Sequence, residues 1–86
     1  MITAFAYIKT EPRATAKLGQ AIADLEGVRE VYSTMGEYDL MAMLWVRDHE
    51  EIATIVTERI GPMAGVLETR TIVAYRAYST AELNLG

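Results

Sequence analysis

Few side chains of this 86-residue chain could move a proton at neutral pH. There is one histidine, His49, and no cysteine, so the other candidates are Glu37, Asp39 and the five tyrosines. Acid–base catalysis needs such groups gathered around a reacting atom. The sequence has no Ser-His-Asp spacing, no cluster of metal ligands and no phosphate-binding glycine loop. We therefore expect no cofactor, and a function in binding is favoured over catalysis.

Charge and composition narrow the function classes further. The formal net charge is −4 and the pI about 4.8, with eight basic residues spread among twelve acidic ones. Direct nucleic-acid binding requires a clustered basic face, so it is not expected. The absence of cysteine excludes a disulfide framework and a zinc ribbon. No apolar run is long enough for a membrane helix and no secretory signal is visible, so we expect a cytoplasmic protein.

The chain repeats one structural unit. The segment that starts at Gly27 (Gly-Val-Arg-Glu-Val) is followed thirty-eight positions later by one that starts at Gly65 (Gly-Val-Leu-Glu-Thr). Each follows a helical pattern and opens a strand. Two units of strand, helix and strand fill a chain of this length and form a split βαβ domain.

Apolar spacing places the individual elements. Residues 2–9 alternate as a strand, and Leu18, Ala21, Ile22 and Leu25 form one stripe of a helix over 12–25 that Gly27 terminates. Strands are predicted over 29–35 and 40–46, and the turn between them makes the pair a hairpin. Asp48 caps a second helix that ends at Gly61, with Glu51 as its capping-box partner. The last strand is predicted over 67–78. Residues 1–78 are expected to form one domain, and 79–86 a C-terminal tail.

This order predicts an α+β, ferredoxin-like βαββαβ fold with a four-stranded antiparallel sheet and both helices on one face. The other face is then uncovered although it is apolar. Its large side chains exceed what a monomer normally exposes. We expect two copies to pack sheet to sheet as an α/β sandwich or barrel, with a second small core inside the monomer as the alternative. The predicted dimer-interface residues are Phe5, Tyr7, Met41, Met43 and Trp45.

Three motifs resemble one family in order and spacing. A Gly-x-x-Asp hairpin at 36–39 follows the second strand, a Gly-Val pair at 65–66 precedes the last strand, and that strand contains Thr69-x-Thr71. Over residues 1–78 the chain resembles the ligand-binding (RAM) domain of the Lrp/AsnC transcriptional regulators. Full-length members carry an N-terminal helix-turn-helix, whereas this sequence starts at the first strand. It therefore resembles the stand-alone form of the module.

The resemblance implies dimers joined through their sheets, often assembled into octamers or decamers, with an amino acid or similar metabolite bound between dimers. Asp39 can accept a bond from an ammonium group, and backbone N–H groups of a glycine hairpin can hold a carboxylate. Met35 and Ile72 would contact the effector's side chain and discriminate between side chains by size. The positions that the resemblance assigns to the ligand site are Gly36, Glu37, Tyr38, Asp39, Thr69, Thr71, Ile72 and Val73. Met35 joins the predicted ligand-binding residues as an apolar neighbour.

Simpler roles exist for the same residues. Gly36 can simply provide the positive φ of the turn, and Asp39 can close the turn with a side-chain hydrogen bond. An acidic residue at a hairpin tip, such as Glu37, is usually solvated. Thr69 and Thr71 suit any strand. Two other functions also stay open: a small cofactor-independent oxygenase or isomerase of the same fold, and a ligand-free oligomerisation subunit. A sensor without a DNA-binding domain would regulate transcription indirectly, by co-assembling with a full-length Lrp/AsnC regulator.

Overall fold

The computed structural model describes residues 1–80. Its elements alternate in the order βαββαβ, as the sequence predicts, and no helix of the described part is long and apolar enough to cross a membrane. The elements are strand β1 (Ile2–Thr10), the 3₁₀ turn η1 (Pro12–Ala14), helix α1 (Thr15–Ala23), strands β2 (Val28–Ser33) and β3 (Leu40–Val46), helix α2 (His49–Ala53), the π-helical segment η2 (Thr54–Ile60) and strand β4 (Val66–Val73).

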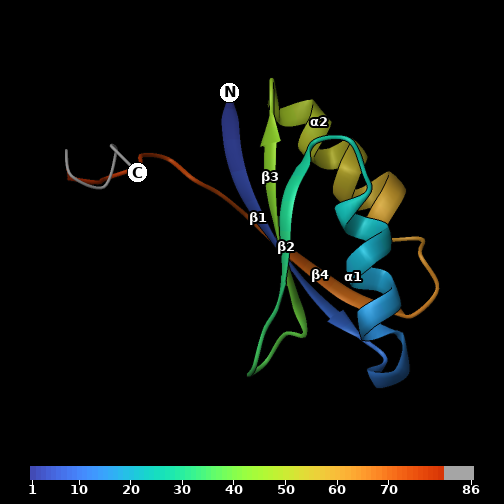
Figure 1. Cartoon of the computed structure of the whole chain (residues 1–86). Coiled ribbons are helices and arrows are strands. Elements are labelled where there is room, and N and C mark those ends of the chain that lie inside the picture. The colour runs from blue at the N-terminus through green and yellow to red at the C-terminus, as the bar shows by residue number, and fades with distance from the viewer. Residues whose placement is uncertain (81–86) are drawn as a thin grey trace.

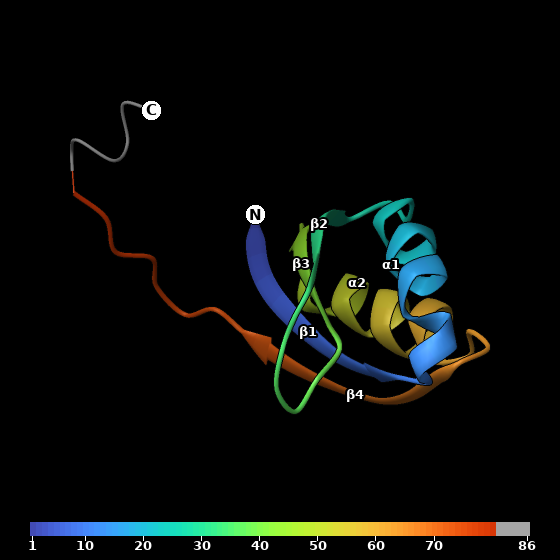
Figure 2. The same cartoon turned by 60° about the horizontal axis from the view of Figure 1, so that its bottom comes forward.

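The four strands form one antiparallel sheet in the order β2-β3-β1-β4. Figures 1 and 2 show both helices on the same face of this twisted sheet, and no helix or strand of residues 1–80 is layered on the other face. The predicted ferredoxin-like α+β fold is confirmed. We call the uncovered side of the sheet the open face.

The core lies between the sheet and the helices. Ala4, Ala6 and Ile8 of β1 have no exposed surface, and the alternating residues of β3 beside them are equally buried. The two central alanines leave room for the helices to approach the sheet closely. The helix side chains that complete this core are Leu18, Ile22, Ile52, Ile55, Val56 and Ile60.

The second helix begins and ends where the sequence predicts. The Asp48 carboxylate accepts a hydrogen bond from the backbone N–H of Glu51 at 3.0 Å, which satisfies a donor of the first turn. At the other end the N–H of Gly61 donates to the carbonyl of Val56 at 2.8 Å, a spacing of five residues that marks the π-helical segment.

Two glycines explain the repeated sequence unit. Gly27 and Gly65 both have positive φ values, +91° and +97°, at the turns that lead from helix to strand. A Cβ on Gly27 would lie 2.6 Å from Ile55 Cδ1, and one on Gly65 would lie 2.6 Å from Ala14 Cβ. Each glycine therefore lets the chain reverse directly against a packed helix.

Three elements end two or more residues earlier than the sequence predicts. The first helix ends at Ala23 instead of residue 25, because the N–H of Leu25 turns back to Ile22 at 3.0 Å. Strand β2 ends at Ser33 instead of residue 35, because Thr34 already bonds across the hairpin to Asp39. Strand β4 ends at Val73, not at residue 78.

The end of β4 is set by its neighbour. Val73 pairs with Ala4, and the N–H of Ala74 donates to the carbonyl of Thr3 at 2.9 Å. Because β1 begins at Ile2, its backbone offers little to pair with further residues of β4. The predicted division into a domain over 1–78 and a tail over 79–86 stays a prediction, and residues 81–86 of that tail lie outside the described part.

Gly65→Ala should lower the free energy of unfolding by about 1–3 kcal/mol, because it adds a clash with Ala14 to an unfavourable backbone conformation. Gly36→Ala is the control: its φ is +121° but nothing lies within 4 Å of the added methyl group. We expect a smaller loss there in urea unfolding. Equal losses would show that the clash with the helix contributes nothing.

Candidate functional site

The hairpin between β2 and β3 is tied to the end of β1 by Asp39. Its N–H donates to the carbonyl of Ile8 at 3.0 Å, and its Oδ2 accepts from the N–H of Thr10 at 2.8 Å. The β1–β3 pairing ends at Ile8 and Leu40, and the register between β1 and β4 shifts between Lys9 and Thr10. The Asp39 carboxylate thus takes the place of a strand partner at this end of β1.

This geometry supports the turn-closing role of Asp39. It leaves the ligand role available as well, because a carboxylate has about four acceptor sites and Thr10 occupies one of them. Thr34 closes the hairpin from the other side, with its hydroxyl donating to the carbonyl of Tyr38 at 2.8 Å. At the tip, Met35 is fully exposed and Gly36 has positive φ, as expected for the turn.

Tyr38 joins the hairpin to the open face. Its ring lies 5.7 Å from that of Tyr7, centroid to centroid, and its hydroxyl donates to the Glu68 carboxylate at 3.0 Å. Desolvation and the bond to Glu68 raise the pKa of Tyr38 above its ordinary value. The phenol is therefore protonated at neutral pH and acts as a donor. Sequence reasoning missed Glu68 as its partner.

The strand residues of the predicted site divide between the two faces of β4. Thr69 and Thr71 pair with Ile8 and Ala6 and so point to the helix side, as Val73 does, whereas Ile72 pairs with Phe5 on the open face. The start of β4 lies across β1 from the hairpin. Ile72 and Val73 lie three and four residues further along than Thr69, roughly 10–13 Å away.

Of the predicted site residues, Tyr38 and Asp39 thus lie together at the end of β1; Thr69 lies at the same end but points to the helix side, and Ile72 and Val73 lie further along β4. Met35 and Glu37 lie at the exposed hairpin tip. A single chain therefore gathers only part of the predicted site, and the hairpin tip is exposed to solvent.

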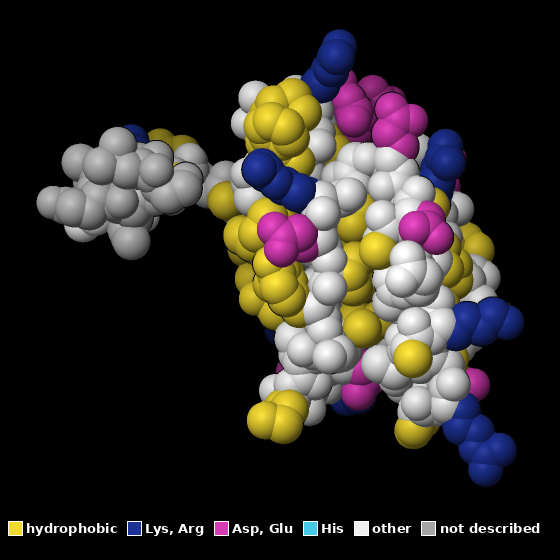
Figure 3. All heavy atoms as spheres, viewed as in Figure 1, with side chains coloured by type: hydrophobic (Ala, Val, Ile, Leu, Met, Phe, Trp, Pro, Cys, Tyr) yellow, Lys and Arg dark blue, Asp and Glu magenta, His cyan; other side chains and the backbone are white. Residues whose placement is uncertain are grey.

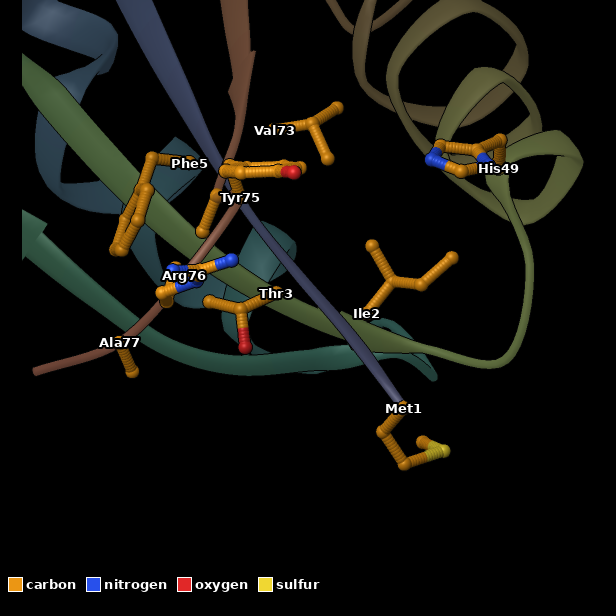
Figure 4. Close-up of a pocket in the computed structure, with 10 residues that line it drawn as sticks. Met1, Ile2, Thr3, Phe5, His49, Val73, Tyr75, Arg76 and Ala77 are labelled. Atoms are coloured by element: carbon orange, nitrogen blue, oxygen red, sulfur yellow. The ribbon is translucent and has the colours of Figure 1, made fainter.

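A separate hollow of about 750 Å³ lies at the opposite end of β1 (Figure 4). His49, Val73 and Tyr75 line it, together with the first residues of the chain, and none of the described residues that line it carries a carboxylate. His49 projects from α2 across the hollow from Val73 and Tyr75. Within residues 1–80 no group of three or more histidine or acidic side chains could hold a metal ion.

The open face carries the predicted interface residues. Pairing places Phe5 opposite Met43 and Tyr7 opposite Met41, and Trp45 lies 46% exposed on the same face. Figure 3 shows hydrophobic side chains along the side of the molecule away from the helices, with charged side chains among them. Arg29 lies over the Trp45 ring, with its guanidinium carbon 4.8 Å from the ring centroid.

Comparison with known proteins identifies the family. The model of the Lrp/AsnC ligand binding domain matches residues 3–83, so the chain belongs to this family. It is 34% identical to the transcriptional regulator LrpA of Pyrococcus horikoshii over 69% of this chain and 42% of that protein. Regulator FL11 of Pyrococcus abyssi is 30% identical over 93% of this chain and 53% of its own length. The chain thus spans about half the length of these relatives.

Solved structures share the fold. The protein TTHA0845 from Thermus thermophilus is 45% identical, with a TM-score of 0.89 over 93% of this chain and all of that one. A regulator of Neisseria meningitidis solved as a complex with L-Met has a TM-score of 0.82 at 14% identity, covering 92% of this chain and 53% of that one. The siroheme decarboxylase NirDL has a TM-score of 0.77 at 23% identity, and the match covers 87% of this chain and 26% of that protein. The last two show the fold alone.

The structural role of Asp39 can be measured directly. Asp39→Ala removes the acceptor for the Thr10 N–H and should lower the free energy of unfolding by about 1–3 kcal/mol. Asp39→Asn keeps a side-chain oxygen and should lose less than half of that. If both variants unfold at the same urea concentration as the unaltered chain, Asp39 does not hold the hairpin to β1.

Proposed function

We propose that the chain is an amino-acid-binding sensor module of Lrp/AsnC type that acts in transcriptional regulation through its assembly with other subunits. The match to the Lrp/AsnC ligand binding domain over residues 3–83 carries this proposal. It covers every element of the fold, and the named relatives are transcriptional regulators. A cytoplasmic location is proposed on the same ground.

The chemistry of the hairpin supports an amino acid as effector. Asp39 presents a carboxylate with remaining acceptor capacity, which suits an ammonium group. Backbone N–H groups of the glycine turn suit the ligand's carboxylate. Met35, at the exposed tip, offers an adaptable apolar contact for the ligand's side chain. A structural neighbour solved with L-Met is consistent with this class of ligand.

A second subunit would complete the site. Small-molecule sites usually bury most of the ligand surface, whereas the hairpin tip is exposed in a single chain. Residues 69–73 of a neighbouring copy could supply the apolar and hydroxyl contacts that the hairpin lacks. The effector would then bind at a boundary between subunits and respond to the state of assembly.

The open face supports the dimer that such an assembly starts from. Its aromatic and methionine side chains are only half-buried in one chain, and a second sheet would cover them as in an α/β sandwich or barrel. A full-length Lrp/AsnC regulator carries the same kind of domain and could take the place of the second copy. Larger rings, octamers or decamers, would be built from these dimers.

Regulation requires that the effector distinguish assembly states. A ligand shifts an equilibrium only by the difference in its affinity for the two states. A site shared between dimers has this property, because it is complete only in the larger assembly. The regulated step is then association with other subunits and needs no catalytic residue, so a non-enzymatic role is proposed.

The proposal predicts selective binding of one or a few of the twenty amino acids, measured as saturable thermal stabilisation of the folded chain. Asp39→Asn should weaken that binding about tenfold or more, because it removes the charge but keeps an acceptor for Thr10. Glu26→Gln removes an exposed charge before β2 and is the matched control. Stabilisation by none of the twenty in a folded oligomer would contradict the proposal.

A further inference from the structure

Strand β4 is an open edge of the sheet. The strand order β2-β3-β1-β4 leaves its outer side without a partner strand within residues 1–80, as Figure 2 shows. Its exposed apolar side chains are Leu67 (59%), Ile72 (51%) and Val73 (42%). An edge strand presents unpaired backbone N–H and C=O groups, and an apolar edge is suited to pairing with another molecule. The β4 edge is therefore an interaction surface that the single chain leaves uncovered.

The opposite edge, β2, is less suited to such pairing. Its register with β3 shifts directly after Val28, and a bulge of this kind makes an edge harder to extend. Its charged side chains are also engaged within the chain. Arg29 lies over the Trp45 ring, and Glu30 accepts a hydrogen bond from the Tyr32 hydroxyl. The register between β4 and β1, by contrast, shifts only near the start of β4.

The backbone of β4 presents hydrogen-bonding groups on alternate residues. Residues 68–73 pair regularly with β1, and the N–H of Ala74 continues that register by donating to the carbonyl of Thr3 at 2.9 Å. In an antiparallel ladder, every second residue turns its N–H and C=O toward the neighbouring strand. Counting back from Ala74, the even-numbered residues bond to β1. The odd-numbered ones, Thr69 among them, therefore point these groups to the free edge.

The charged side chains of β4 are spaced to complement a second copy of the same strand. Glu68 and Arg70 pair with Lys9 and Tyr7 of β1 and so lie on the open face, one on either side of Thr69. Within residues 1–80 neither forms an ion pair. If two copies of β4 pair antiparallel about a two-fold axis at Thr69, Glu68 lies opposite the partner's Arg70 and Arg70 opposite the partner's Glu68. Two opposite-charge pairs then stabilise one contact.

Other registers of this strand pair fit less well. Side chains directly opposite each other lie on the same face of a sheet, so the axis of a regular pair falls on a residue. An axis at Arg70 would set two arginines opposite each other, which is destabilising. An axis at Thr71 would set Arg70 opposite the partner's Ile72. Only the axis at Thr69 pairs the charges, and there the two Thr69 residues also exchange two backbone hydrogen bonds.

The hairpin is bonded to this edge. The Tyr38 hydroxyl donates to the Glu68 carboxylate at 3.0 Å. A carboxylate has about four acceptor sites, so Glu68 can accept from the partner's Arg70 as well. The hairpin of the candidate ligand site and the β4 edge are thus connected through one carboxylate.

We infer that β4 is a second subunit interface, at which its free edge pairs antiparallel with β4 of another copy of this chain about a two-fold axis at Thr69. This deepens the proposed function and rests on it in one respect: the edge is the surface through which the proposed sheet-to-sheet dimers join. The open face and the β4 edge are different sides of the sheet, so one chain can make both contacts. Each dimer has two such edges, and alternation of two two-fold contacts can close a ring.

Charge reversal tests the partner and the register. Arg70→Glu sets like charges opposite each other at two points, and it should raise the dissociation constant of the edge contact about tenfold or more. Glu68→Arg should act in the same direction. The double variant restores both pairs in reverse and should recover most of the affinity. Sedimentation equilibrium measures all three. The matched controls, Arg13→Glu and Glu58→Arg, reverse exposed charges elsewhere and should match the unaltered chain.

Thr69→Pro tests the backbone pairing. Proline lacks an N–H group, and at Thr69 that group points to the free edge, so the ladder to β1 is kept while both central bonds of the contact are lost. The variant should unfold near the same urea concentration as the unaltered chain and should not form the edge contact. Thr69→Ser keeps the N–H group and is the control, which should assemble like the unaltered chain.

The outcomes separate this inference from the proposed function. The β4 interface is overturned if the unaltered chain stops at a dimer in which Trp45 is covered, or if Arg70→Glu assembles as far as Arg13→Glu. It is overturned equally if the double charge variant is no tighter than the single ones. The sheet-to-sheet dimer and amino-acid binding then stand. If Trp45 stays exposed while association still depends on Arg70, the edge contact stands and the sheet-to-sheet dimer fails.

Discussion

The structure depends on one constraint: two helices can cover only one face of a four-stranded sheet. The central strand β1 is covered on one side, where Ala4, Ala6 and Ile8 are fully buried beneath the helices. Its alternate residues, Phe5 and Tyr7, face the other way and are only half-buried. Because these too are large and apolar, the fold in isolation leaves hydrophobic surface in water. The proposed dimer and the proposed ligand site shared between subunits both depend on how that surface is covered.

The candidate ligand site lies at the end of that same strand. β1 continues beyond its last pair with β3, and there the Asp39 carboxylate accepts the hydrogen bond from the Thr10 N–H. Tyr38 lies on the open face, in contact with Tyr7 and hydrogen-bonded to Glu68. The hairpin is thus held in place by the residues proposed to bind the ligand. The structural role of Asp39 and its proposed binding role fall on one carboxylate, so they can be separated only by a substitution that keeps the hydrogen bond and removes the charge.

The sequence predicted the parts of the fold that local patterns encode. Alternation identified the buried face of β1, the side chain of Asp48 marked the start of α2, and the repeated Gly-Val pairs marked two turns against packed helices. It misplaced the end of β4, because strand length there is set by where a distant partner begins. It also missed the bond from Tyr38 to Glu68, thirty residues apart, since no local pattern records which residue a hairpin side chain will meet.

The central claim is that the open face is a subunit interface. Trp45 is the only tryptophan of the chain and lies on that face, so its fluorescence reports directly on what covers it. We would dilute the protein from about 100 μM to about 10 nM and record the emission maximum together with the sedimentation mass. The account predicts a blue-shifted emission at high concentration that moves red as a dimer dissociates. A monomer mass with unchanged, exposed-type emission across the whole range would contradict it.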